Sequence, residues 1–326
     1  MGLTQGRSNG SWLNGAAHTV EMDVNERSDE MTDLNREQGL VAKVAVIGAG
    51  TMGGAMAARL LGAHFDVDVW SRGPLPALTN LGATSYKDVS DAVATADVVL
   101  TMLPTADVTT EIMFDAKGLD AMRRDAIWIQ MATIGPNATD RIAARARTQR
   151  SDVTFIDAPV SGSKGPAEAG QLLILASGDE AHRPILDRVF AVIGKRTVWL
   201  GAVGAGSRMK LILNTWLAFQ IEGAAEASSL ASRLGVSSSA LLDALGDSPL
   251  TSPYALAKLE RILDADFRPD FSLDLALKDL DLVGTDAGTV AAPIAADIAN
   301  RWRQLVATGA SGLDVSAAAM GLATSP

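Results

Sequence analysis

The sequence contains no cysteine and only three histidines. Without a thiol, the chain can form no disulfide, no thiolate nucleophile and no cysteine-based metal site. The histidines, His18, His64 and His182, stand far apart and lack the spacing of zinc ligands. We therefore expect no metal site.

Long hydrophobic runs and an excess of basic residues are also missing. No stretch of 18 or more uninterrupted apolar residues occurs, so we expect no membrane-spanning helix. The formal net charge of −10 argues against a nucleic-acid partner and favours solubility. With 326 residues, 48% of them hydrophobic, the chain has the length for about two domains with a sizeable core.

Residues 1–40 are poor in apolar residues and carry seven acidic residues against three arginines. They lack the apolar core of a secretory signal, and their acidity argues against a mitochondrial transit peptide. We interpret them as a disordered N-terminal extension and expect a cytoplasmic protein.

Residues 41–203 alternate short β-branched runs with helix-like segments. The expected strands are 41–48, 66–70, 97–103, 126–131 and 153–159, and the expected helices are 52–63, 75–81, 105–114 and 137–149. This alternation predicts an α/β fold with a parallel, doubly wound sheet, that is, an N-terminal Rossmann domain. The runs at 172–177 and 196–201 are expected to extend the same sheet.

Residues 204–326 have a different pattern, because strand signals vanish after Gly206. A long helix is expected over 209–234, and the remainder is helical in period, with interruptions at prolines. We therefore predict an all-α C-terminal domain. The boundary falls in the glycine-rich stretch near 203–205.

A glycine-rich turn follows the first expected strand and opens a helix. Gly48 permits the tight turn, Gly50 lets a pyrophosphate approach the backbone, and Gly53 lets helix and strand pack closely. The first helical residues, Thr51 and Met52, then supply free N–H groups for phosphates. Because strand, turn and helix occur in the required order, dinucleotide binding is favoured over a purely structural turn.

The end of the second strand indicates which dinucleotide is bound. Enzymes that use NAD carry an acidic residue there, which binds the ribose 2′-hydroxyl. Here Ser71 and Arg72 occupy that place, and a guanidinium with a hydroxyl suits a 2′-phosphate. We predict NADP(H), with NAD(H) as the second choice; alternatively, Arg72 is an ordinary surface residue.

Lys210 begins the long helix among apolar neighbours such as Met209 and Leu211. A lysine on the first turns of a helix is usually a solvated side chain. This one shares a helix face with Asn214, four residues later, and its helix is apolar on most sides. Burial of this lysine would call for a functional explanation.

Four segments resemble the β-hydroxyacid dehydrogenases, a family that includes 3-hydroxyisobutyrate dehydrogenase and the glyoxylate/succinic semialdehyde reductases. The segments are GAGTMGGAMA (48–57), DAPVSGSKGPAEAG (157–170), GAGSRMKLILN (204–214) and PDFSLDLALKDLDLV (269–283). They resemble, in this order, the cofactor signature, the substrate-binding segment, the catalytic-lysine segment and the C-terminal lysine–aspartate segment of the family. The resemblance runs collinearly from about residue 42 to 320.

This resemblance implies roles for residues that bind and transform the substrate. Lys210 matches the catalytic acid/base, whose pKa burial and a neighbouring cation would lower, and Asn214 matches the residue that orients it. The substrate carboxylate would be held by the loop residues Ser161, Gly162 and Ser163. Residues of the helical domain would close the site: Phe271, Lys278 and Asp279.

The resemblance also places residues beside the cofactor, after the fourth and fifth strands: Met102, Leu103, Pro104 and Thr133, together with Lys278. Two positions depart from the family pattern. Ser163 stands where glycine is frequent, and Ala132 stands where serine is frequent before Thr133. Both departures concern the carboxylate pocket, and therefore the identity of the substrate.

We expect an NADPH-dependent reductase of small carboxylate-bearing aldehydes or ketones, reversible with 3-hydroxy acids. One alternative is an imine reductase, although such enzymes generally lack the lysine found at 210. Another is a non-catalytic NADP-binding module, which the joint presence of Lys210, Asn214 and Lys278 argues against. The family resemblance also implies a homodimer or homotetramer.

Overall fold

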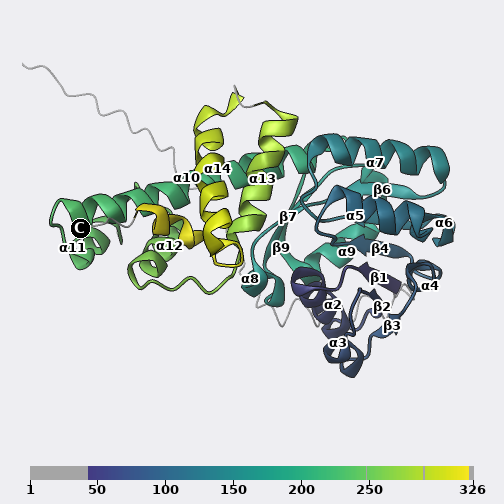
Figure 1. Ribbon diagram of the computed structural model, residues 1–326. Coiled ribbons are helices and arrows are strands. Elements are labelled where there is room, and N and C mark those ends of the chain that lie inside the picture. The colour runs from purple at the N-terminus through teal and green to yellow at the C-terminus, as the bar shows by residue number, and fades with distance from the viewer. Residues whose placement is uncertain (1–42, 247, 289–290, 323–326) are drawn as a thin grey trace, which may run out of the picture.

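The computed structural model describes residues 43–246, 248–288 and 291–322. The extension predicted at residues 1–40 lies outside these ranges. Figure 1 shows two parts, a sheet-containing part built from the first half of the chain and a helical part built from the second. The long helix α10 (Ala205–Arg233) connects them.

Six parallel strands form the main sheet, in the order β3-β2-β1-β4-β5-β6. They are β1 (Lys43–Ile47), β2 (Asp66–Trp70), β3 (Thr84–Tyr86), β4 (Val98–Thr101), β5 (Ile127–Gln130) and β6 (Thr154–Asp157). The predicted doubly wound Rossmann fold is confirmed. Only the edge strand β3 was not predicted, since it is short and mostly exposed. Strand order reverses between β1 and β4, and ligands of such sheets bind at the carboxyl ends of the strands beside this point.

Helices cover both faces of the main sheet because alternate residues of its strands point to opposite sides. Val44 and Val46 face a core that includes α2 and α9, whereas Ala45 and Ile47 face one that includes α4, α6 and α7. The helices of this part are α2 (Thr51–Gly62), α3 (Pro76–Asn80), α4 (Val89–Val93), α5 (Ala106–Thr110), η1 (Glu111–Asp115), α6 (Gly118–Ala121), α7 (Pro136–Gln149), α8 (Lys164–Glu168), η2 (Glu180–His182) and α9 (Arg183–Ile193).

The prediction that residues 172–177 and 196–201 extend the main sheet was wrong. They form β8 (Leu172–Ala176) and β9 (Gly194–Trp199), which belong to a separate three-stranded sheet ordered β7-β8-β9. After β6 the chain passes directly into β7 (Val160–Ser161), which pairs antiparallel with β8. Only the short α8 separates β7 from β8, which is too little chain for the crossover that a further parallel strand requires. By contrast, α9 supplies such a crossover, and β9 pairs parallel with β8.

The helical part confirms the predicted all-α region. Besides α10 it contains α11 (Ser238–Gly246), α12 (Pro253–Leu263), α13 (Leu273–Asp286), α14 (Pro293–Leu305), η4 (Val306–Ala310) and η5 (Val315–Leu322). Its core surrounds the fully buried Trp302 and includes Ile221 of α10. In the ranges that the structure covers, no helix combines the length and the apolar character needed to cross a membrane.

Candidate active site

The glycine-rich turn has the geometry that a bound dinucleotide requires. Gly48 has φ +93°, and a Cβ there would lie 2.5 Å from the Met102 carbonyl oxygen. A Cβ on Gly53 would collide with the Gly48 carbonyl oxygen, so helix and turn pack as closely as the sequence predicted. Gly50, in contrast, faces open space, which leaves the backbone accessible to a phosphate.

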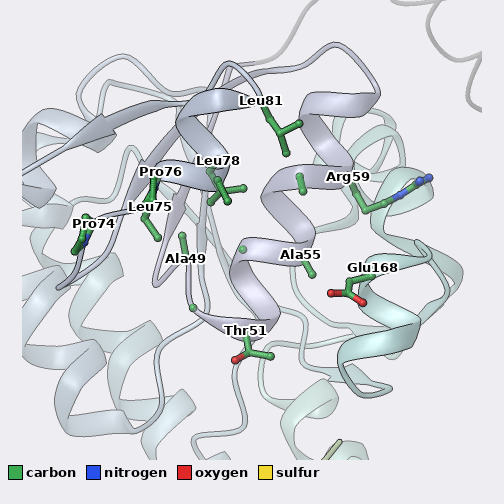
Figure 2. A pocket seen from close by; sticks show the side chains of 14 residues that line it. Ala49, Thr51, Ala55, Arg59, Pro74, Leu75, Pro76, Leu78, Leu81 and Glu168 are labelled. Carbon is green, nitrogen blue, oxygen red and sulfur yellow. The ribbon is translucent and has the colours of Figure 1, made fainter.

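The N-terminus of α2 is free to bind an anion. Its cap residue, Gly50, has no side chain to accept the first N–H groups, and the first turn carries no acidic residue. A cavity of 630 Å³ opens beside it, between α2, α3 and α8 (Figure 2). Thr51 lies at one end of this cavity, Pro74 and Leu75 line one side, and Arg59 and Glu168 lie on another. The exposed N–H groups and the helix dipole fit a pyrophosphate.

The other residues predicted to bind cofactor follow the carboxyl ends of neighbouring strands. Ser71 and Arg72 follow β2, Met102, Leu103 and Pro104 follow β4, and Thr133 comes three residues after β5. Arg72 is exposed and makes no hydrogen bond or ion pair with another described residue. No carboxylate stands at the end of β2. An exposed cation without a partner among the described residues therefore follows the end of β2.

Lys210 and Asn214 are both buried, 9% and 5% exposed, on one face of α10. Asn214 Nδ2 donates a hydrogen bond to Asp279 Oδ2 of α13. Helix spacing predicted that Lys210 and Asn214 share a face, and the family resemblance implied that Asp279 closes the same site. The structure brings Asn214 and Asp279 together although 65 residues separate them.

Lys278 connects Asp279 to the edge of the main sheet where the residues predicted to bind cofactor lie. Its Nζ lies 2.9 Å from Asp279 Oδ1 and donates a hydrogen bond of 2.5 Å to the carbonyl oxygen of Thr133. Helix α13 therefore reaches from the helical part to the loop after β5. Residues predicted to handle substrate and residues predicted to line the cofactor lie next to each other here.

The electrostatic environment of Lys210 shifts the pKa of its amine. Burial lowers the pKa of its ammonium to about 8; Asp279 acts against this shift and Lys278 adds to it. The side chain of Lys210 makes no hydrogen bond or ion pair with any other residue that the structure describes. Its amine is therefore buried without a directly bonded counter-ion among these residues.

The predicted carboxylate loop lies against the same helix. Ser161 belongs to β7, which contacts α10 directly. Gly162 has φ +133°, and a Cβ there would lie 2.8 Å from the side chain of Leu172, so the loop conformation requires glycine. Ser163 caps α8 without a side-chain hydrogen bond. Phe271 packs against the helical core, and its N–H donates to Asp314 Oδ2 at 3.3 Å.

Comparison with known proteins agrees with this arrangement. Residues 43–201 match the model of the NAD-binding domain of 6-phosphogluconate dehydrogenase, and residues 204–322 match that of the NAD-binding region of NADP-dependent 3-hydroxyisobutyrate dehydrogenase. Glyoxylate/succinic semialdehyde reductase 1 of Arabidopsis thaliana is 33% identical over 280 residues, which cover 84% of this chain and 96% of the relative.

The chain belongs to the β-hydroxyacid dehydrogenase family.

Solved structures support this assignment to different degrees. Mycobacterium tuberculosis 3-hydroxyisobutyrate dehydrogenase, solved with L-serine, has a TM-score of 0.78 and 30% identity, and the match covers 87% of this chain and 100% of that one. An imine reductase of Myxococcus stipitatus has a TM-score of 0.60 at 20% identity, with 87% and 100% coverage, which shows a common fold alone. This β-hydroxyacid dehydrogenase is accordingly an NAD(P)-dependent oxidoreductase.

In this family member, the cofactor and the protein supply different parts of the reaction. A bound nicotinamide supplies the hydride transfer, and the turn at Gly48, Gly50 and Gly53 fits its dinucleotide. The protein's part is to bind and orient the substrate. Among the residues with a described placement, no group of three His, Asp or Glu side chains could hold a metal.

Sequence reasoning missed one buried polar cluster beside the site. Asp157, the last residue of β6, is fully buried and accepts hydrogen bonds from Ser207 of α10 and Ser177, which follows β8. The only signal in the sequence is that Asp157 opens the segment DAPVSG, directly before the carboxylate loop. Its partners are 20 and 50 residues away, so no local pattern links them.

Proposed function

We propose that this protein is an NADPH-dependent oxidoreductase of small carboxylate-bearing aldehydes or ketones and the corresponding hydroxy acids. The observation that carries the proposal is the environment of Lys210, whose amine is buried, lacks a direct partner in the described structure and has a pKa of about 8. Reduction of a carbonyl leaves a developing alkoxide, which needs a proton donor within hydrogen-bond reach. Lys210 is that donor.

The neighbouring residues hold the lysine and the substrate in place. Asn214 and Asp279 hydrogen-bond each other beside Lys210 and fix the base of the site. In the proposal, Ser161 and Gly162 bind the substrate carboxylate through hydroxyl and backbone N–H groups, assisted by Ser163. The helical region contributes the remaining substrate contacts, from Phe271, Lys278 and Asp279.

The cofactor preference is proposed from the end of β2. Arg72 supplies charge and a fork of donors for a 2′-phosphate, and Ser71 adds a hydroxyl. NADPH is therefore the preferred cofactor, and NADH the weaker one. The other residues proposed to line the cofactor site are Gly48, Gly50, Thr51, Met52, Gly53, Met102, Leu103, Pro104, Thr133 and Lys278.

Three wider predictions belong to the same proposal. Residues 41–203 form the cofactor domain, and residues 204–326 form the substrate and oligomerisation domain. A homodimer or homotetramer is supported by apolar side chains that α10 leaves exposed, among them Ile212 at 62% and Trp216 at 63%. The cytoplasmic location stays a prediction.

A substrate panel with both cofactors tests the proposal. Glyoxylate and succinic semialdehyde should be reduced, and 3-hydroxyisobutyrate oxidised, with NADP(H) giving the higher kcat/KM. Binding of NADPH without turnover of any panel member would indicate the non-catalytic module instead. Turnover of cyclic imines without turnover of aldehydes would indicate an imine reductase.

A further inference from the structure

Asp157 is a buried carboxylate that forms no ion pair with any cation in the described part of the chain. Its Oδ1 accepts from Ser207 Oγ at 2.7 Å, and its Oδ2 accepts from Ser207 N at 2.8 Å and Ser177 Oγ at 3.2 Å. Burial raises the pKa of this carboxyl to about 6, against the hydrogen bonds from Ser207 and Ser177. Burying an unpaired carboxylate costs free energy, so stability alone is a poor explanation for it.

The hydrogen bonds fasten the first turn of α10 to three other elements. Besides the bonds to β6, Gly206 N donates to Ser177 Oγ at 3.0 Å, and Thr139 Oγ1 of α7 lies 2.9 Å from Ser207 Oγ. The backbone approach is also close, because a Cβ on Gly206 would collide with the carbonyl oxygen of Leu175. Helix α10 therefore has little freedom to slide along the sheets at this point.

In the proposed function, this attachment lies between the carboxylate loop and Lys210, the two groups that contact the substrate. Asp157 comes four residues before Ser161, which begins the carboxylate loop. Its partner Ser207 comes three residues before Lys210, less than one helical turn. One side chain therefore ties the strand that leads to the carboxylate loop to the helix that carries the amine.

We propose that Asp157 is a positioning residue that sets the separation between the carboxylate loop at Ser161 and Gly162 and the amine of Lys210. This proposal rests on the proposed function. A fixed separation selects substrates by the number of carbons between carboxylate and carbonyl, because a misplacement of about 1 Å costs on the order of 10²-fold in rate. Asp157 thus contributes to substrate choice without touching the substrate.

Two substitutions at this position separate geometry from charge. In Asp157→Asn, the amide oxygen can accept from Ser207 N and Ser177 Oγ. The amide NH₂ can donate to Ser207 Oγ, whose hydroxyl then turns toward Thr139. Asp157→Ala removes every side-chain contact. We expect Asp157→Asn to stay within about tenfold of the wild-type kcat, and Asp157→Ala to lose about 10²-fold on the preferred acid.

The decisive measurement is the ratio of kcat/KM for glyoxylate to that for succinic semialdehyde. These acids differ by two methylene groups between carboxylate and carbonyl. Asp157→Ala should move this ratio toward one, Asp157→Asn should preserve it, and the Kd for NADPH should change by less than about twofold, since the dinucleotide turn is untouched. Ser207→Ala, which keeps the backbone bond to Asp157, should give a smaller shift in the same direction and serves if Asp157→Ala does not fold.

Glu222→Ala provides the matched control. Glu222 is a buried carboxylate of α10 that pairs with Arg301 of α14, away from the sheets. Its loss should lower the melting temperature and leave the substrate ratio unchanged. An unchanged ratio in active Asp157→Ala and Ser207→Ala would overturn the positioning role alone. Absence of turnover by the wild-type protein would overturn the proposed function and this inference together.

Discussion

Two lysines of the helical part are almost equally buried but differ in their partners. Lys258 of α12 is 6% exposed, and its Nζ lies 2.7 Å and 2.9 Å from the two carboxylate oxygens of Asp314. Lys210 of α10 is 9% exposed, and its side chain has no hydrogen bond or ion pair within the described structure. The carboxylate that raises the pKa of Lys210, Asp279, is in contact with Asn214 and Lys278 instead.

The difference shows that burial alone does not identify a catalytic lysine. Although burial of Asp314 opposes it, the hydrogen bonds from Lys258 and Ser316 lower the pKa of that carboxyl, so the carboxylate form of Asp314 is favoured. Asp314 also accepts from the backbone N–H groups of Asp270 and Phe271 and holds that loop in place. Lys258 therefore stabilises the fold, whereas Lys210 is the proton donor only in the proposed function.

The same substitution at both lysines tests this comparison. Lys210→Met should reduce kcat by roughly 10²–10⁴-fold, the range for loss of a general acid. Its melting temperature should hold or rise, because methionine removes the cost of burying an ammonium at a similar volume. Steady-state kinetics and thermal unfolding of the purified variant check both expectations.

Lys210→Arg distinguishes proton transfer from charge. Guanidinium stays protonated at any accessible pH and cannot exchange a proton near neutrality. This variant should therefore lose nearly as much kcat as Lys210→Met, with NADPH binding retained. An active arginine variant would contradict the acid/base assignment and favour the non-catalytic module.

Lys258→Met should give the opposite result. It leaves the carboxylate of Asp314 buried without its cation, which costs about 3–5 kcal/mol of unfolding free energy. The kcat of the folded protein should stay within about tenfold of the wild type, because the side chain of Lys258 contacts Asp314 and Tyr254, neither of which is proposed to touch substrate or cofactor. Denaturant unfolding gives the stability, and activity is compared per folded molecule. Full stability with a large loss of kcat would reverse the two assignments.

Arg72 extends the comparison to a second cation without a described partner. If it binds a 2′-phosphate, Arg72→Ala loses a charge-assisted contact worth about 1.5–3 kcal/mol, or roughly ten- to a hundredfold in KM for NADPH. The KM for NADH should stay nearly constant. Equal losses with both cofactors would make Arg72 an ordinary surface residue.

The smallest effect is expected at the N-terminus. Residues 1–40 have too little apolar content to offset the entropy of ordering, so a shortened protein that begins at Leu40 should keep full activity and melting temperature. If so, the comparison of Lys210 with Lys258 does not depend on the extension. A large drop in either quantity would show that the extension contributes to that body.

Local patterns were enough to predict the parts of this protein that depend on neighbouring residues. The glycine turn at Gly48, Gly50 and Gly53 and the position of Lys210 and Asn214 on one helix face follow from strand, turn and helix geometry. The separate three-stranded sheet did not follow, because pairing of β7 with β8 depends on the length of the connection rather than on the strand pattern.

The partners of the buried ionic groups could not be predicted from the sequence either, because they lie far away along the chain. Asp314 lies 56 residues from Lys258, and Ser207 lies 50 residues from Asp157. Lys258 sits in an amphipathic helix and differs in no local way from a solvated lysine. Only the fold shows which buried charges have partners.

The pH dependence of both reaction directions tests the central claim about Lys210 most directly. The reductive direction needs the protonated amine, so kcat/KM should be level below pH 8 and fall about tenfold per pH unit above it. The oxidative direction needs the neutral amine, so kcat/KM should rise toward pH 8 and then level off. Lys210→Met should lose this inflection in the residual activity. Profiles that bend the same way in both directions, or an inflection that persists without the lysine, would contradict the assignment.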